Sequence, residues 1–220
     1  MVQQGYRAMA RVFGVVFPIV GAAAIVGGKF AEHFVAGQLR SEEITMPGAE
    51  DIEREVGIGL VSEQDATRLR PHAGVTLSSG DQARIYADHY VLSHMIFAAE
   101  KAGVPRDKAT YAGVGDFAQE LTLELRDEVR RDNPELGPGE VNALARAEIN
   151  DPESDYSLAR RIKSLHELRA ENFFMGNSIR GMLLNAYGWW LLGQIAKWAG
   201  CGLIGLGAAL FGGSWLGRRD

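Results

Sequence analysis

The sequence predicts an all-α membrane protein in which two antiparallel transmembrane helices extend into a mainly helical extracytoplasmic domain. Two observations favour this fold class. Long apolar stretches lie near both ends of the 220-residue chain, and most charged residues lie between them. A helix needs about 20 apolar residues to cross a hydrocarbon core of roughly 30 Å. The overall hydrophobic fraction of 46% averages these regions and conceals both.

The first apolar stretch predicts a transmembrane helix at 12–30, preceded by a cytoplasmic tail at 1–11. A cleaved signal peptide is the alternative, because basic residues precede the stretch and residues 22–24 are all alanine. The apolar run continues without a turn into a further helical pattern, as expected for a helix that extends above the membrane. A retained anchor is therefore favoured.

The second apolar stretch predicts a transmembrane helix at 197–216 and a cytoplasmic tail at 217–220. The apolar character begins earlier, at 182, and a helix from there to 216 is roughly 50 Å long. One crossing with a helical extension fits this length better than two short crossings. Residues 31–196 are then the extracytoplasmic domain, including the extensions of both helices.

Lysine and tryptophan mark the expected membrane boundaries. Lys29 lies roughly 27 Å along the first helix from Arg11, and Lys197 lies roughly 31 Å along the second from Arg218. Both lysines therefore reach similar heights, where a long side chain can extend to the interface. The expected interface residues are Lys29, Lys197, Trp198, Trp215, Arg218 and Arg219.

Small residues recur every four positions on both predicted spans. Small faces let helix backbones approach closely in lipid. They are expected to pack the two spans on each other, with packing against another subunit as the alternative. The predicted packing residues are Cys201, Gly205, Ala209, Gly213 and Gly217 on the second span and Ala23, Gly27 and Ala31 on the first.

Charge predicts the orientation. The chain has a net charge of −5, whereas both tails are basic, so the acidic excess lies between the spans. Short basic flanks stay in the cytoplasm, which predicts cytoplasmic termini and an outward-facing central domain in a plasma membrane. Cys201 is the only cysteine, so no disulfide can form within the chain. An extracytoplasmic domain without disulfides favours a bacterium.

Helical periodicity is clear in most of the central region. It predicts helices at 81–102, 116–131 and 140–149, and a longer one from 154 or 155 that reaches towards 182. Residues 74–80 are read as either a short strand or a loop. The stretch 51–71 shows no decisive pattern.

No complete catalytic or metal-binding motif is present, so no cofactor is expected. His89 and His94 are five residues apart, which places them about 140° apart on a regular helix. His166 and Glu167 begin a zinc-protease signature, but Ala170 stands where its second histidine would be. Net acidity and the expected location argue against nucleic acid.

Tyr187, Trp189 and Trp190 form an aromatic cluster just above the outer boundary. Interfacial anchoring is one interpretation, because tryptophan and tyrosine are enriched at membrane–water interfaces. The other is a contact surface for a protein partner or lipid.

Two blocks of sequence carry a resemblance to a known group. They are 38–47, with the sequence QLRSEEITMP, and 178–188, with the sequence SIRGMLLNAYG; residues 87–90 (ADHY) lie between them. Together they resemble uncharacterised actinobacterial membrane proteins with one span at each end. Some members of the group are labelled aromatic ring-opening dioxygenases. The resemblance implies a cell-envelope location, whereas no clustered iron ligands are visible in the sequence.

The sequence thus favours a non-enzymatic two-span protein that acts as an accessory or interaction subunit. Its expected partners are the lipid bilayer and either an integral membrane protein or a second copy of the chain. The alternative is a membrane-anchored extracytoplasmic enzyme or ligand-binding domain. This alternative requires a concave site that collects Asp88, His89 and His166.

Overall fold

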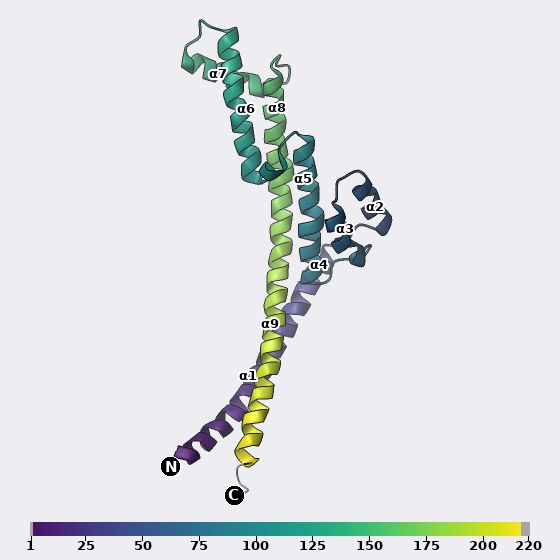
Figure 1. Cartoon of the computed structure of the whole chain (residues 1–220), viewed down its shortest axis with the longest axis vertical. Helices are drawn as coiled ribbons and strands as arrows, with labels where there is room; N and C mark the ends of the chain where they lie inside the picture. Colours follow the sequence, from purple (N-terminus) through teal and green to yellow (C-terminus); the bar gives the residue numbers. More distant parts are fainter. Residues whose placement is uncertain (1, 217–220) are drawn as a thin grey trace. The chain divides into compact units, whose positions relative to one another are not determined.

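The computed structural model describes residues 2–216 (Figure 1). The chain is 83% helical, and the described residues contain no strand. It divides into two compact units. We call residues 1–47, 72–86 and 182–220 the helix-pair unit, and residues 48–71 and 87–181 the bundle unit. The predicted all-helical class and the two long apolar helices are confirmed, whereas the predicted domain boundaries remain predictions.

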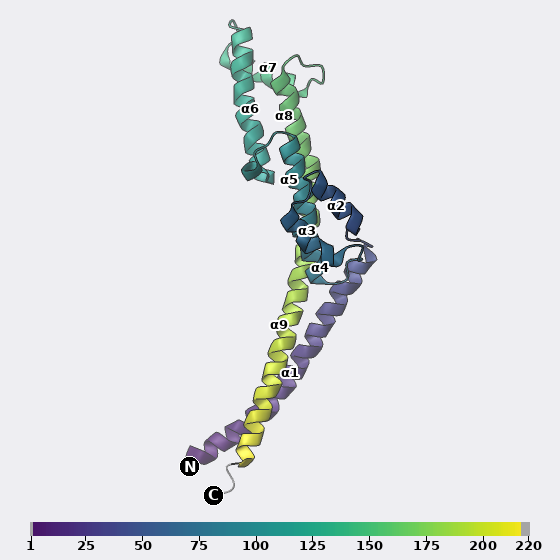
Figure 2. The same cartoon turned by 45° about the vertical axis from the view of Figure 1, so that its right-hand side comes forward.

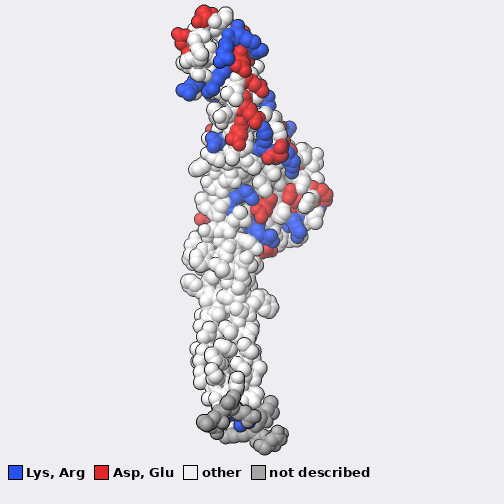
Figure 3. Space-filling model, turned by 60° about the vertical axis from the view of Figure 1, so that its left-hand side comes forward, with Lys and Arg blue, Asp and Glu red and all other residues white. Residues whose placement is uncertain are grey.

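The helix-pair unit is built on α1 (Val2–Ser41) and on the part of α9 (Phe174–Leu216) from Met182 onward. The two helices run side by side in both views (Figures 1 and 2). α4 (Gly80–Ile85) completes this unit. On the face drawn in Figure 3, the helix pair carries almost no charged side chains, whereas mixed charges cover the bundle unit.

The two long helices meet along glycines that are seven residues apart. Gly14, Gly21 and Gly28 are buried on α1, and α9 buries a matching row. That row is Gly193, Gly200, Gly207 and Ser214. A Cβ atom added to Gly21 would lie 2.5 Å from the carbonyl oxygen of Gly200, so the backbones themselves are in contact. A seven-residue repeat is that of left-handed helix pairs. We call these two rows the glycine seam.

The predicted packing stripes do not form this contact. A Cβ atom added to Gly27, Gly205 or Gly213 would meet nothing within 4 Å. The side chains of Ala23, Cys201 and Ala209 are exposed as well. Among the described residues of these stripes, only Ala31 lies in the contact between the two helices. A Cβ atom added to Gly193 would lie 3.3 Å from the Ala31 Cβ. Gly217 lies outside the described residues.

Helix geometry explains why the stripes of residues four apart rotate away from the contact between α1 and α9. Residues four apart are displaced by about 40° at each step, so such a row soon leaves the contact line. Residues seven apart drift by only about 20° per repeat, which slight supercoiling removes. The glycine seam can therefore stay between the helices from Gly14 to Gly28 of α1.

The segment that follows α1 pairs with the segment that precedes α4 within the helix-pair unit. Thr45 and Thr76 form an isolated antiparallel bridge, in which the backbone N–H of Met46 donates to Val75 and that of Leu77 donates to Ile44. The expected alternatives for 74–80 were a strand or a loop. The structure shows a loop with a single bridge pair.

The bundle unit contains a three-helix core. α6 (Tyr111–Asp132), α7 (Pro138–Asn150) and α8 (Ser157–Glu167) pack their apolar rows together. Its fully buried residues include Val114, Leu125, Val129, Val141, Ile162 and Leu165. The hydroxyl of Thr110 caps α6 by accepting a hydrogen bond from the backbone of Gly113 at 2.9 Å, and Pro138 occupies the first turn of α7. These helices contain the segments predicted at 116–131 and 140–149.

Two short helices occupy the stretch that showed no pattern. α2 (Ala49–Gly57) and α3 (Glu63–Leu69) pack next to each other. Arg70 joins them, because its guanidinium lies 2.8 Å from Glu53 and 2.6 Å from Glu63. A short 3₁₀ helix, η1 (Arg70–His72), follows.

Two predicted helices are interrupted by π-helical turns. The segment predicted at 81–102 consists of α4, the π-helical η2 (Tyr86–Val91) and α5 (Leu92–Lys101). The long helix expected from 154 or 155 begins as α8 and passes through the π-helical η4 (Leu168–Phe173) into α9. A further 3₁₀ turn, η3 (Arg106–Lys108), precedes α6.

Candidate functional site

The most polar interior of the bundle unit lies where η2 and α5 face α2 and α3. A π-helical turn inserts an extra residue into a helix, and such turns occur frequently at functional sites. Two histidines of η2 and α5 lie close to acidic residues of α3 and α2. His89 Nδ1 lies 2.8 Å from Asp65 Oδ1, and His94 Nε2 lies 3.9 Å from Glu55 Oε1. The two histidines therefore contact different carboxylates, and the π-helical η2 departs from the regular helix that the argument from their five-residue spacing assumed.

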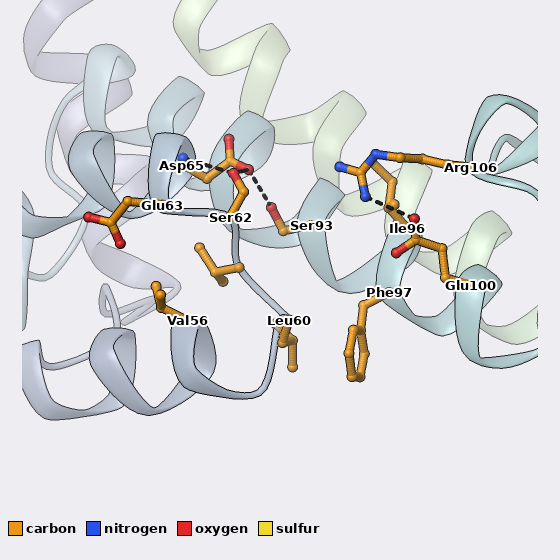
Figure 4. Close-up of a pocket in the computed structure, with 12 residues that line it drawn as sticks. Val56, Leu60, Ser62, Glu63, Asp65, Ser93, Ile96, Phe97, Glu100 and Arg106 are labelled. Atoms are coloured by element: carbon orange, nitrogen blue, oxygen red, sulfur yellow. Dashed lines mark hydrogen bonds and ion pairs between the residues drawn. The ribbon is translucent and has the colours of Figure 1, made fainter.

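Asp65 is the centre of the hydrogen-bond network. One carboxylate oxygen accepts from the hydroxyls of Ser62 at 2.5 Å and Ser93 at 3.2 Å, while the other faces His89. The serine pair and the carboxylate are drawn in Figure 4. Burial by itself raises the pKa of Asp65, but the hydrogen bonds from Ser62, His89 and Ser93 outweigh it and lower that pKa overall.

A second carboxylate is less well satisfied. The side chain of Glu55 is only 12% exposed. Its Oε1 accepts a hydrogen bond of 3.3 Å from the Tyr90 hydroxyl, whereas Oε2 is buried and has no hydrogen-bond partner among the described atoms. Buried carboxylate oxygens without a donor are costly. Glu55 and Asp65 were both missed from the sequence, because the stretch around them gave no pattern.

Arg180 at the start of α9 supports the π-helical turn. Its Nε donates to the backbone carbonyl of Ala87 at 3.0 Å, and its Nη2 lies 2.9 Å from Asp88 Oδ1. A π-helical turn disturbs the regular ladder of backbone hydrogen bonds, so an outside donor to Ala87 compensates for it. Asp88 is therefore engaged in a structural ion pair.

We expect Arg180→Ala to destabilise the bundle unit by about 2 kcal/mol, because it leaves the Asp88 carboxylate and the Ala87 carbonyl without their donor. The effect is measured as faster amide exchange over 86–101 in the full-length protein. Arg54→Ala is the matched control, since Arg54 is 65% exposed and its ion pair is with Asp51 on its own helix. Equal effects of the two substitutions would contradict a supporting role for Arg180.

A cavity of about 210 Å³ lies beside Asp65 (Figure 4). Ser62, Asp65 and Ser93 line its polar end, and the ion pair of Glu100 with Arg106, at 2.9 Å, lies at its edge. The remaining wall is largely apolar and includes Val56, Leu60, Val61, Ile96 and Phe97. The cavity combines a fixed carboxylate with an apolar surface and is large enough for a few non-hydrogen atoms.

The network does not form a hydrolytic triad. In such a triad the carboxylate orients a histidine, and the histidine hydrogen-bonds a serine hydroxyl. Here both serine hydroxyls donate to the carboxylate of Asp65, and the Ser93 hydroxyl also lies 2.9 Å from the His89 carbonyl oxygen. Within residues 2–216, no group of three or more histidine, cysteine or acidic side chains is arranged to hold a metal ion.

The three residues that an enzymatic site was expected to collect are not brought together. Asp88 pairs with Arg180, and His89 pairs with Asp65. His166 is exposed on α8. Each side chain serves a different surface or contact.

Asp65 also predicts how the α2–α3 region responds to acid. Its pKa lies below the ordinary value of 3.8 in the folded protein, so the ionised form is favoured by folding. The stability that it contributes is therefore complete above pH 3.8 and is lost as the pH falls through the lowered folded pKa. We expect amide protection over 49–69, corrected for intrinsic exchange, to be retained at pH 5 and to weaken progressively below pH 4.

Asp65→Ala is expected to weaken the same protection already at pH 7, by about 2 kcal/mol, since three donors lose their acceptor. Asp127→Ala serves as the control, because Asp127 is 71% exposed and its ion pair is with Arg130 on the same helix. If Asp65→Ala leaves exchange over 49–69 unchanged while the fold is intact, the network does not hold this region.

The expected interface residues fall on the helix-pair unit. Lys197 is not a lone anchor, because its Nζ lies 2.6 Å from Glu32 Oε2 on α1. Gln194 Nε2 approaches the other oxygen of Glu32 at 3.4 Å. Glu32 was missed, although it follows Lys29 by one helical turn and was the nearest acidic residue. Lys29 itself is exposed.

The two tryptophans predicted at the interfaces are exposed on α9. Trp198 is 77% exposed and Trp215 is 52% exposed, with the Arg11 guanidinium 5.9 Å from the Trp215 ring centre. Arg218 and Arg219 lie outside the described residues.

Two residues of the aromatic cluster, Tyr187 and Trp190, pack inside the helix-pair unit. Tyr187 and Trp190 stack with ring centres 6.1 Å apart, and the Arg84 guanidinium lies 5.1 Å from the Tyr187 ring. Gly80 packs directly beneath Trp190. Of the three predicted partner-surface residues, Trp189 remains the most available, with 58% exposure.

Comparison with protein-family models, curated proteins and solved structures finds no match to this chain. Its function is therefore inferred from the chemistry and packing of its own residues.

Proposed function

We propose that the chain is a two-span plasma-membrane protein with an extracytoplasmic bundle unit that acts as a non-enzymatic interaction subunit. One observation carries the proposal. α1 and α9 bury glycines between them and direct large apolar side chains outward, among them Ile19, Val26, Phe30 and Trp198 at 64%, 68%, 73% and 77% exposure. Soluble monomers rarely expose contiguous apolar patches of this kind. A bilayer would cover them.

Burial supports this interpretation over a soluble core helix. Only 11% of the most apolar window of each long helix is buried within the protein. A soluble core helix of the same composition would be mostly covered by its own fold. The packing of α1 along α9 also supports a retained first span, since a cleaved leader would remove half of the glycine seam.

The charge pattern supports the orientation. The arginines of both tails favour cytoplasmic termini, which leaves the acidic central region outside. A bacterial plasma membrane is proposed because the lone Cys201 permits no disulfide in that region. The resemblance to actinobacterial two-span proteins fits the same location.

An interaction role is proposed because most ionisable groups of the polar network are engaged in structural contacts. Asp65 pairs with His89 and Asp88 pairs with Arg180, and the hydroxyls of Ser62 and Ser93 donate to Asp65 rather than to the His89 ring. Exposed Trp189 offers an aromatic contact of the kind enriched at protein interfaces. The partner would be an integral membrane protein or a second copy of the chain.

Native purification in a mild detergent, followed by mass spectrometry, tests this role. We expect a stoichiometric membrane partner, or a homo-oligomer, that is lost in Trp189→Ala. Trp198→Ala is the control, because Trp198 is equally aromatic and is more exposed. A monodisperse single chain that behaves identically in both variants would contradict the proposal.

The cavity beside Asp65 favours a second candidate function, a membrane-anchored ligand-binding domain. Its carboxylate end and apolar wall would suit a small molecule with a donor group. A screen of small amines by thermal shift, with Asp65→Asn as the comparison, tests this candidate. Shifts that persist in Asp65→Asn would exclude Asp65 as the binding group.

A further inference from the structure

The shape of the cavity beside Asp65 limits the ligands that it can hold. All of its lining residues belong to the bundle unit. Its volume of about 210 Å³ corresponds to roughly seven water molecules at about 30 Å³ each, which leaves room for about five or six non-hydrogen atoms. Leu60 and Phe97 lie below Asp65 and Ser93 in Figure 4. A ligand that fits is therefore small, with one polar end and an apolar stem.

The polar end presents hydrogen-bond acceptors that are not fully used. A carboxylate offers about four acceptor positions, and Asp65 uses at most three of them, for Ser62, Ser93 and His89. The Ser62 oxygen accepts the Asp65 backbone N–H at 3.1 Å and can accept one bond more. Ser93 is only 8% exposed, and within residues 2–216 its oxygen donates but accepts no hydrogen bond. A ligand with several N–H donors satisfies this end.

The lining of the cavity has an acidic excess. Its charged residues are Glu63, Asp65, Glu100 and Arg106. Arg106 is held by Glu100 at 2.9 Å, and Lys101, which is not part of the lining, lies with Nζ 5.3 Å from the Phe97 ring centre. Hydrogen bonding lowers the pKa of Asp65, so this carboxylate is ionised at neutral pH. Its side chain is 24% exposed, so a cation can reach it.

We propose that this cavity binds a primary alkylammonium group with an apolar stem of about four carbons. The three N–H donors of an ammonium match the unused acceptor positions of Asp65, Ser62 and Ser93. The bond to the carboxylate is charge-assisted, and the stem lies against the apolar wall. A free small amine and the lysine side chain of a polypeptide both supply this chemistry. The inference rests on the second candidate function, the ligand-binding domain.

Isothermal titration calorimetry of the full-length protein in phosphatidylcholine nanodiscs tests the site, with empty nanodiscs titrated to subtract partitioning into lipid. We expect n-butylamine to bind about tenfold more tightly than 1-butanol or butanoate, which share its length but lack the ammonium. Ethylamine should bind more weakly than n-butylamine, because its shorter stem buries less apolar surface. These comparisons use the wild-type protein, so they do not depend on the folding of a variant.

Asp65→Asn should weaken the binding of n-butylamine about tenfold, because it removes the charge from the principal hydrogen bond. Asp127→Asn is the matched control and should leave binding unchanged, since Asp127 is 71% exposed on α6. Nα-acetyl-lysine N-methylamide carries the same four-carbon stem on a peptide unit. Binding comparable to that of n-butylamine assigns the site to a lysine side chain, whereas much weaker binding assigns it to a free amine.

Two outcomes would overturn the inference. If 1-butanol binds as tightly as n-butylamine, or if a folded Asp65→Asn protein binds n-butylamine unchanged, the cavity does not select an ammonium through Asp65. The ligand-binding candidate then stands, because the cavity is still occupied. If none of the probes binds, both the alkylammonium site and the ligand-binding candidate are contradicted. Neither outcome bears on the interaction role, which the co-purification experiment tests separately.

Discussion

Gly21→Leu is expected to separate α1 from α9. A Cβ atom at position 21 would lie 2.5 Å from the carbonyl oxygen of Gly200 and 2.9 Å from the side chain of Ile204. A carbonyl group in a helix cannot swing away as a flexible side chain can, so the whole helix must move. Overpacking of this kind costs typically 1–3 kcal/mol, and we expect about 3 kcal/mol because a leucine adds three further carbons. Gly200→Leu should act similarly from the opposite side.

Tryptophan fluorescence during an SDS titration measures this effect, because all four tryptophans lie on α9. Gly27→Leu is the matched control on the same helix. It makes the same chemical change, but a Cβ atom at position 27 meets nothing within 4 Å. The SDS concentration at the midpoint of the transition should fall for Gly21→Leu and stay constant or rise for Gly27→Leu. Equal shifts would contradict the glycine seam and would favour the four-residue stripe that contains Gly27.

Lys197→Glu is also expected to weaken the helix pair strongly, by charge repulsion rather than by overpacking. It would place a second carboxylate opposite Glu32, where Lys197 Nζ now lies 2.6 Å from Glu32 Oε2. Like charges in contact at an interface cost several kcal/mol. The Lys197 side chain is 23% exposed and that of Glu32 is 38% exposed. Solvent therefore screens the repulsion, and we expect the helix pair to lose about 2 kcal/mol of stability.

The exchanged pair, Glu32→Lys with Lys197→Glu, distinguishes an ion pair from a general sensitivity at position 197. We expect it to recover more than half of the lost stability in the same SDS titration, because it restores opposite charges at this contact. Lys29→Glu is the control for charge reversal, since Lys29 is exposed on the same helix as Glu32. No recovery in the exchanged pair would show that Lys197 does not act through Glu32.

The helical fold class could be predicted because two long apolar runs and several amphipathic rows of residues indicate it directly. The contact between the long helices could not be predicted from small residues alone. Both spans contain so many glycines and alanines that rows of four and rows of seven coexist. Gly21 and Gly27 look equivalent in the sequence, and only the three-dimensional pairing with Gly200 distinguishes them.

The polar network in the bundle unit was missed for a different reason. Angular arguments about His89 and His94 assume 3.6 residues per turn, and the π-helical η2 violates that assumption. Asp65 and Glu55 lie on helices of seven and nine residues, which are too short to show periodicity. The Glu32–Lys197 pair joins residues that are 165 positions apart, and no local pattern reports such a contact.

Cysteine accessibility in intact bacterial cells is the decisive measurement for the proposed two-span topology. Single cysteines are placed by Glu135→Cys, Gln4→Cys and Asp220→Cys in a Cys201→Ser background, and cells are treated with a membrane-impermeant maleimide. A two-span protein with cytoplasmic termini predicts labelling at position 135 in intact cells, and labelling at positions 4 and 220 only after lysis. Protection at position 135 with labelling at either terminus, or uniform labelling at all three positions, would contradict this topology.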